Sequence, residues 1–136
     1  MTLEPYRASA VAVNGKAVLL EGPSGVGKSD LALRLISRGA ILISDDYVNL
    51  KAVSGKLVAS PPKNIAAKLE VRGIGIHDFP FVENIPVVLV ISLAPREDIS
   101  RMPEKNFIEI LGFRLPKFVL HAFDASTPDK IFMLLA

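Results

Sequence analysis

Residues 16–46 read KAVLLEGPSGVGKSDLALRLISRGAILISDD. The unbroken apolar run at residues 16–21 predicts a strand that is buried on both faces. After a glycine-rich segment, apolar side chains recur at helical spacing, at Leu31, Ala32, Leu35 and Ile36. A second short strand is expected at residues 41–43. Together these features predict a strand, a loop, a helix and a strand, which is the order of one βαβ unit.

The glycine-rich segment matches the pattern G-x-x-x-x-G-K-[ST] at every fixed position. Its residues are Gly22, Pro23, Ser24, Gly25, Val26, Gly27, Lys28 and Ser29. The glycines let backbone N–H groups turn inward around phosphate oxygens, and the following helix directs its free N–H groups at the same anion. Lys28 is expected to reach the β- and γ-phosphates, and the Ser29 hydroxyl to ligate Mg²⁺. A chance turn is the alternative, but the expected flanking strand and helix favour a nucleotide site.

Two adjacent carboxylates, Asp45 and Asp46, follow the second strand. A right-handed crossover makes this strand run parallel to the first, so the carboxyl ends of both strands open on the same side of the sheet. One carboxylate is then placed to hold a metal ion, and the other to accept the proton of an attacking hydroxyl. The alternative is that the pair only begins a turn. Its position after this strand favours the functional interpretation.

A second charged pair lies in residues 69–76, LEVRGIGI, which are expected to form one strand. Alternate residues of a strand share a face, so Glu70 and Arg72 are expected to project together. Such a pair could hold a second metal position and clamp a phosphate. From the spacing alone, a charged face in contact with solvent is the better interpretation.

The rest of the chain predicts mostly strands. Hairpin turns are expected at Asn14-Gly15 and at Ser54-Gly55. Strands are expected at residues 8–13, 48–53, 56–59, 87–92 and 118–122, and a closing helix at residues 129–134. We therefore expect a single α/β domain over residues 1–136, in which a strand-rich body follows one βαβ unit.

The composition excludes several kinds of function. The 136 residues contain no cysteine, which rules out disulfides, thiolate catalysis and cysteine-based zinc sites. A net charge of +2 gives no reason to expect a nucleic-acid partner. The apolar run at residues 87–91 is far shorter than the ~20 residues that cross a bilayer, and the first residues lack the pattern of a signal peptide. We expect a cytoplasmic protein without membrane contact.

Residues 22–46, together with LEVRGIGI, resemble the catalytic domain of HPr kinase/phosphorylase, a bifunctional serine kinase of the phosphotransferase carrier HPr. The close Asp-Asp pair and the second motif make this resemblance more specific than the phosphate loop alone. It extends from about residue 7 to residue 120 and looks like the short proteobacterial form. It implies a P-loop kinase core related to phosphoenolpyruvate carboxykinase, with a strand-rich mixed sheet and few helices.

The resemblance also implies roles for residues at matching positions. Residues 22–29 would bind the nucleotide. Asp45 would be the base for the serine hydroxyl and the acid in the reverse direction, while Lys28 and Arg72 would contact phosphate. The residues that would organise Mg²⁺ are Ser29, Asp46 and Glu70. ATP and Mg²⁺ are the implied cofactors, an HPr-like phosphocarrier is the implied partner, and the hexamers of longer family members imply self-association.

The chain departs from the family pattern at two places. Arg7 stands where the family usually has a histidine, and an arginine beside Asp45 would hold that carboxylate ionised through its opposite charge. Residues 124–127 lack the arginine of a Gly-Arg-Asn stretch that the family uses in handling phosphate. Both departures favour the kinase reaction over phosphorolysis. The alternatives are a catalytically weakened nucleotide-binding regulator and a small-molecule P-loop kinase.

Two further expectations concern apolar segments. The scattered phenylalanines, Phe123 among them, show no stacking pattern and are expected in the core. Residues 107–118, FIEILGFRLPKF, are expected either to form a protein-docking loop or to be buried. His77 and His121 have no partner at metal-ligand spacing and are expected to be ordinary core or surface histidines.

Overall fold

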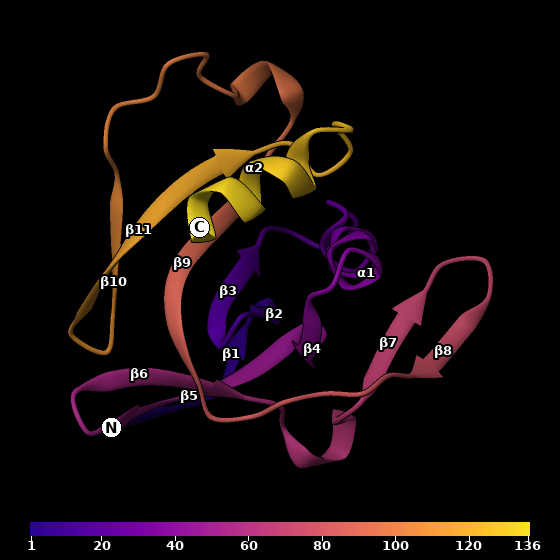
Figure 1. The fold of residues 1–136 in the computed structure, drawn as a ribbon, viewed down its shortest axis with the longest axis vertical. Coiled ribbons are helices and arrows are strands. Elements are labelled where there is room, and N and C mark those ends of the chain that lie inside the picture. Colours follow the sequence, from indigo (N-terminus) through magenta and orange to yellow (C-terminus); the bar gives the residue numbers. More distant parts are fainter.

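One large sheet carries most of the chain in this computed structural model, which describes residues 1–136 (Figure 1). Its nine strands are β1 (Thr2–Arg7), β2 (Ser9–Val13), β3 (Lys16–Glu21), β4 (Ile41–Ser44), β5 (Tyr47–Val53), β6 (Lys56–Ser60), β9 (Ile85–Leu93), β10 (Phe107–Ile110) and β11 (Phe113–Leu120). The remaining elements are helices α1 (Lys28–Ser37) and α2 (Thr127–Leu135), two 3₁₀ turns, η1 (Lys63–Ile65) and η2 (Arg96–Asp98), and strands β7 (Lys68–Val71) and β8 (Gly75–Asp78). The expected strand-rich α/β fold with few helices is confirmed.

The sheet is mixed. Seven strands follow the order β1-β5-β6-β9-β3-β2-β4, while β11 pairs with β9 and β10 pairs with β11. β3, β9 and β11 run parallel to one another, whereas β2 pairs antiparallel with both β3 and β4. β4 therefore runs in the same direction as β3, with β2 between them. The carboxyl ends of four strands meet at one edge of the sheet, where open α/β sheets bind their ligands.

Two hydrophobic clusters cover the two faces of β3. Val18 and Leu20 belong to the cluster that both helices complete, in which Leu31 of α1 and Ile131 of α2 are fully buried. Leu19 belongs to the opposite cluster, which contains buried residues of β5, β6, β10 and β11. Burial on both faces explains why β3 has a continuous apolar sequence instead of an alternating one.

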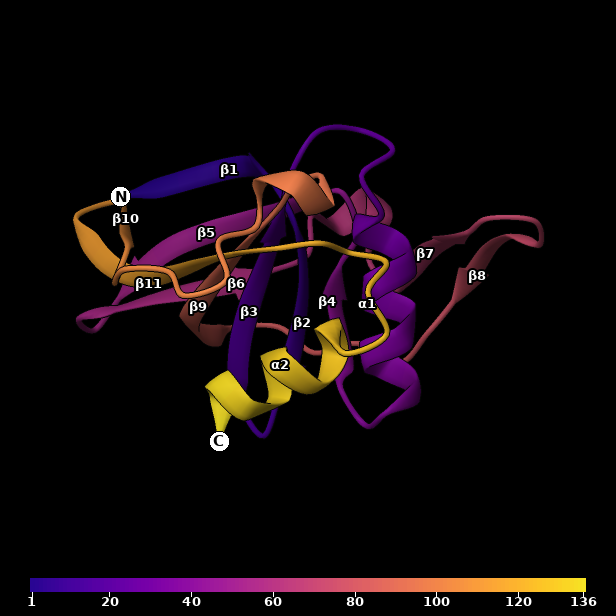
Figure 2. The same cartoon turned by 90° about the horizontal axis from the view of Figure 1, so that it is seen from above.

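The prediction of one strand at residues 69–76 is wrong. β7 and β8 pair antiparallel in a separate two-stranded sheet, with the chain turning at residues 72–74. Gly73 and Gly75 have φ values of 91° and 111°, which glycine adopts without steric cost, so the two glycines of R-G-I-G allow the reversal. The hairpin extends away from the large sheet in both views (Figures 1 and 2).

Residues 107–118 do not form the docking loop that we considered. β10 and the first part of β11 make a hairpin across Leu111 and Gly112, which both have positive φ. Ile110 and Leu115 are buried, so the burial alternative holds for this part of the hairpin. The strand expected at 118–122 begins earlier, at Phe113. β1, which pairs with β5, was not anticipated.

The helices of this fold are short. α1 has 10 residues and α2 has 9. None of the helices is both long enough and apolar enough to cross a membrane.

Candidate functional site

Glycine is required at two fixed positions of the phosphate loop between β3 and α1. Gly22 has a φ of 151° and Gly27 a φ of 105°, values that other residues rarely adopt. A Cβ on Gly22 would lie 2.8 Å from Cγ1 of Val26, and a Cβ on Gly27 would lie 2.7 Å from Cζ of Phe123. Backbone conformation and space therefore both demand glycine, in the kind of concave loop that binds anions.

The amine of Lys28 folds back over this loop. Its Nζ donates to the carbonyl oxygens of Gly22 at 2.7 Å and Pro23 at 3.2 Å, and the residue is only 6% exposed. Burial lowers the pKa of Lys28, and the nearby charge of Arg7 lowers it further, while Asp46 and Asp45 act in the opposite direction. Phosphate oxygens in the loop would offer this amine full negative charges in place of neutral carbonyls.

Asp45 is held by a network of three hydrogen bonds. The Ser29 hydroxyl donates to its Oδ1 at 2.7 Å, and the Ser9 hydroxyl donates to the same oxygen at 3.1 Å. The backbone N–H of Glu70 donates to Oδ2 at 3.2 Å. These bonds connect Asp45 at the end of β4 with the first turn of α1, with β2 and with β7. Asp45 is therefore the structural centre of the site.

Asp46 differs from its neighbour. Its φ of 70° places it in the left-handed region, which aspartate tolerates in turns, and its backbone N–H donates to the Ser9 hydroxyl at 3.0 Å. No other residue donates a hydrogen bond to the Asp46 carboxylate, and its side chain is exposed. The pair thus contains one anchored and one free carboxylate.

Glu70 and Arg72 reach the site from the β7–β8 hairpin. Glu70 lies in β7, whereas Arg72 lies in the turn, so they do not project from one strand face as predicted. The hairpin is anchored beside α1 by Leu69, which is fully buried in the cluster under the helices, and by the bond from Glu70 to Asp45. Both charged side chains nevertheless line the same cavity.

One cavity of about 410 Å³ brings the predicted site residues together. Its 13 lining residues are Ser24, Gly25, Gly27, Lys28, Ser29, Asp30, Leu33, Asp45, Asp46, Glu70, Val71, Arg72 and Phe123. Every residue predicted to act in catalysis or to bind a metal is among them. Gly22, Pro23 and Val26 of the loop are not. The predicted assembly of the loop with the acid pair and with Glu70 is therefore present in space.

Two side chains at the end of β1 contact the phosphate loop and the end of β3. Arg7 donates a hydrogen bond to the hydroxyl of Ser24, and Tyr6 donates to the carboxylate of Glu21 at 2.8 Å. Burial, and next the bond to Glu21, raises the pKa of Tyr6 above its ordinary value. No ion pair joins Arg7 to Asp45, so the expectation that this arginine holds Asp45 ionised is not met by a direct contact.

Sequence reasoning missed two members of the site. Ser9 is fully buried at the start of β2 and bonds to both aspartates, but a lone serine before an apolar strand carries no signal of this role. Phe123 was expected in the core and instead lines the cavity. Its position just after β11 could have drawn attention to it, since ligands bind beyond the carboxyl ends of parallel strands.

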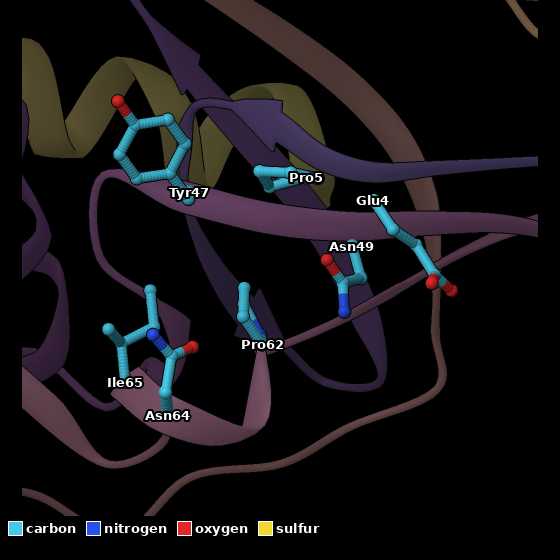
Figure 3. Close-up of a pocket in the computed structure, with 7 residues that line it drawn as sticks. All are labelled: Glu4, Pro5, Tyr47, Asn49, Pro62, Asn64 and Ile65. Carbon is cyan, nitrogen blue, oxygen red and sulfur yellow. The ribbon is translucent and has the colours of Figure 1, made fainter.

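A second hollow of about 400 Å³ lies beside β5 (Figure 3). It is lined by Glu4, Pro5, Tyr47, Asn49, Pro62, Asn64 and Ile65. None of these residues is basic, and Glu4 adds a negative charge, so the hollow does not suit a phosphate group. The cavity at the phosphate loop is the better candidate for nucleotide chemistry.

The oxygen donors in the main cavity suit a Mg²⁺ ion that keeps bound waters better than a metal ion coordinated by protein ligands alone. No group of three or more histidines or carboxylates is close enough to hold a metal ion by itself. Mg²⁺ binds oxygen donors, keeps several waters and is usually held by one or two carboxylates together with substrate phosphates. A hydroxyl from Ser29 and a carboxylate from Glu70, beside a phosphate loop, fit that requirement.

Comparison with known proteins gives a consistent result. The family model described as HPr Serine kinase C-terminal domain matches residues 4–123. The HPr kinase/phosphorylase of Caldicellulosiruptor bescii is 39% identical over 125 residues, which cover 81% of this chain and 39% of that protein. The HPr kinase/phosphorylase of Clostridium tetani is 47% identical over 79 residues, which cover 58% of this chain and 26% of that protein. The chain thus spans well under half the length of these curated relatives.

A solved structure extends the similarity to the fold. The Hpr(Ser) kinase/phosphatase from Coxiella burnetii superimposes with a TM-score of 0.85 at 29% sequence identity. The match covers 96% of this chain and 87% of that chain. The likeness therefore extends over nearly the whole chain, well beyond the segments that carry the sequence motifs.

Proposed function

This chain belongs to the family of HPr serine kinase C-terminal domains, and we propose that it is an ATP-dependent kinase that phosphorylates a serine of HPr or of an HPr-like phosphocarrier. The observation that carries the proposal is the single cavity that Lys28, Ser29, the two aspartates and Glu70 share. Phosphoryl transfer needs these parts side by side, because its catalysis depends on positioning and on neutralisation of charge. The reverse phosphorolysis, named in the relatives, belongs to the same proposal.

The phosphate end of the nucleotide would be held by residues 22–29. The backbone N–H groups of the loop and the amine of Lys28 donate to the phosphate oxygens. Bound Mg²⁺ supplies further positive charge to those oxygens. The hydroxyl of Ser29 and the carboxylate of Glu70 are the donors that we assign to it, and the bond from Ser29 to Asp45 orients the hydroxyl.

The hydrogen bonds support a division of labour between the aspartates opposite to the one that the resemblance implied. Asp45 already accepts three hydrogen bonds, including one from the metal-binding Ser29, which suits a residue that positions the metal donors. Asp46 has a carboxylate in the cavity that accepts no hydrogen bond, and its charge acts on Lys28, beside which the transferred phosphoryl group would lie. We therefore assign the proton transfer to Asp46.

The chemical step follows from these positions. The Asp46 carboxylate accepts the proton of the serine hydroxyl, and the serine oxygen forms a bond to the γ-phosphorus. The bond between that phosphorus and the β–γ bridging oxygen breaks, and ADP leaves. Arg72 in the β7–β8 turn contacts the phosphoryl group in transit. In phosphorolysis, an oxygen of inorganic phosphate forms a bond to the phosphorus of phosphoserine and the bond between that phosphorus and the serine oxygen breaks. Protonated Asp46 gives its proton to the serine oxygen, and pyrophosphate leaves.

The β7–β8 hairpin supports a protein as the acceptor. Ile74 and Ile76 are 70% and 69% exposed, although both are large and apolar. They lie within a few residues of Glu70 and Arg72, which line the cavity. Exposed apolar side chains at the rim of a site indicate a protein-binding surface, whereas a small-molecule kinase would gain nothing from them. This surface favours an HPr-like acceptor over the small-molecule alternative.

Residues 1–136 would act as one catalytic domain in the cytoplasm, where ATP is available. We also propose that the domain associates with further copies of itself, because the resemblance to the family implies such assembly.

The test is phosphorylation of purified HPr by this protein with ATP and Mg²⁺. We expect phosphoserine on HPr, mapped by mass spectrometry, and its loss with Lys28→Met, which removes the phosphate-binding amine. Pyrophosphate formation from phosphoserine-HPr and phosphate measures the reverse reaction. Tight binding of the nucleotide without any labelled HPr would instead support the nucleotide-binding regulator.

A further inference from the structure

The segment between β11 and α2 borders the phosphate cavity and presents an aromatic ring to it. Phe123 lines the cavity and is 56% exposed, which is unusual for a large apolar side chain. Its ring lies against the loop, because a Cβ added to Gly27 would come within 2.7 Å of its Cζ. The ring of Phe123 therefore lies against the phosphate loop at Gly27 and faces the cavity in which phosphates would bind.

The segment that carries Phe123 is fixed by hydrogen bonds on both sides. Thr127 at the start of α2 donates its hydroxyl to the carbonyl of His121, and Arg34 of α1 donates to the carbonyl of Ala122. Nδ1 of His121 lies 3.0 Å from the carbonyl oxygen of Ala94. The backbone before Phe123 is therefore tied to α1, to α2 and to the end of β9.

The residue after Phe123 is tied as well. Arg96 donates from Nε at 2.9 Å and from Nη2 at 2.6 Å to Oδ1 of Asp124, and the bond from Arg96 lowers the pKa of Asp124. The ring of His121 stands edge-on to that of Phe123, with centroids 5.9 Å apart and planes at 69°. An exposed ring on an anchored backbone loses little conformational freedom when a ligand packs on it.

We propose that Phe123 is the stacking platform for the base of the bound nucleotide. The inference rests on the proposed function, since it assumes that the loop holds nucleotide phosphates. Phe123 is the one aromatic residue among those that line the cavity. An aromatic face stacks on any nucleobase, and a purine offers it more area than a pyrimidine does.

The arrangement of the cavity supports this placement. The β11–α2 segment and the β7–β8 hairpin lie on opposite sides of α1 (Figures 1 and 2). The hairpin carries Glu70 and Arg72, to which we assigned the metal and the transferred phosphoryl group. A nucleotide whose γ-phosphate faces the hairpin then extends its base toward the opposite side, where Phe123 lies.

The chain offers a direct optical test because it contains no tryptophan. Phe123→Trp introduces a single fluorescent reporter at the proposed platform. We expect saturable quenching by ADP and none by inorganic pyrophosphate, which binds the loop but has no base. Phe107→Trp is the matched control, since Phe107 is 42% exposed on β10 and does not line the cavity. Equal changes in both variants would contradict stacking at Phe123.

Affinity measurements give the second readout. Phe123→Ala should raise the Kd of ADP about tenfold, as loss of one base–aromatic stack predicts, while the Kd of pyrophosphate stays within about twofold. Phe123→Tyr should restore ADP binding. If ADP binding is unchanged in Phe123→Ala, or if ADP and pyrophosphate weaken equally, the inference fails while the proposed function stands. If the unaltered chain binds neither ligand, the proposed function fails with it.

Discussion

The hydroxyl of Ser29 donates a 2.7 Å hydrogen bond to Oδ1 of Asp45, which joins the first turn of α1 to the carboxyl end of β4. The two residues are separated by the whole helix in sequence and meet because β3 and β4 run in the same direction. The bond leaves the neighbouring Asp46 as the carboxylate without a partner. The consequences of this asymmetry can be measured.

Replacement of the two aspartates should separate binding from chemistry. Asp46→Asn should lower kcat about 10²- to 10⁴-fold, the usual contribution of a general base, with little change in the KM for ATP. Asp45→Asn should instead raise the concentration of Mg²⁺ needed for half-maximal activity, because Ser29 loses its anchor. Steady-state kinetics with HPr as acceptor measure both. A loss of kcat confined to Asp45→Asn would restore the roles implied by the resemblance.

Nucleotide binding should weaken at alkaline pH through Lys28. Burial lowers the pKa of this amine in the free protein, and bound phosphates favour its charged form. The affinity for ADP is therefore highest below the lowered pKa of Lys28. It decreases as pH rises through that pKa, by up to about tenfold per pH unit. Titration calorimetry between neutral pH and the ordinary lysine pKa measures this slope. Lys28→Arg remains charged over the same range and should give a flat profile, so an equal slope in both proteins would exclude Lys28 as its cause.

Ser9 should matter for stability as well as for the site. It is fully buried and bonds to the carboxylate of Asp45 and to the backbone N–H of Asp46. Ser9→Ala leaves that partly buried N–H and the Asp45 carboxylate each short of one hydrogen bond, and should lower the free energy of unfolding by about 1–3 kcal/mol. Urea denaturation measures the change. Ser37→Ala, at the exposed end of α1, is the matched control and should alter stability by less than about 0.5 kcal/mol.

The exposed apolar residues of the β7–β8 hairpin should affect binding of the protein substrate and not binding of ATP. Ile74→Ser combined with Ile76→Ser should raise the KM for HPr about tenfold and leave the KM for ATP unchanged, because loss of an interface anchor costs on the order of 1–2 kcal/mol. Both side chains are exposed, so the melting temperature should stay the same. An unchanged KM for HPr would remove the hairpin from the docking surface.

The parts of this site that could be predicted are those in which local sequence determines local structure. Residues 22–29 adopt their loop because glycines stand where positive φ is needed, and Lys16–Glu21 is a strand because it is apolar on both faces. The direction of β4 followed from the crossover rule. These features depend on neighbours along the chain.

Other parts depended on contacts between distant segments. Nothing in the sequence announces that β2 inserts between β3 and β4, so the role of Ser9 at the start of β2 was not visible. The hairpin break at residues 72–74 was hidden because I-G-I continues the apolar pattern of a strand. Phe123 is a residue type that usually lies in the core, and only the structure shows that its ring is exposed and lies against Gly27 of the phosphate loop.

The position of β3 has a consequence for how the protein fluctuates. Its backbone amides are bonded to strands on both sides and both of its faces are covered, so they should exchange with deuterium only through global unfolding. The β7–β8 hairpin, a two-stranded sheet with every residue of β8 exposed, should exchange at close to the rate of local opening. The phosphate loop that follows β3 and the hairpin residues Glu70 and Arg72 line the same cavity, so the nucleotide side should remain rigid while the acceptor side adapts.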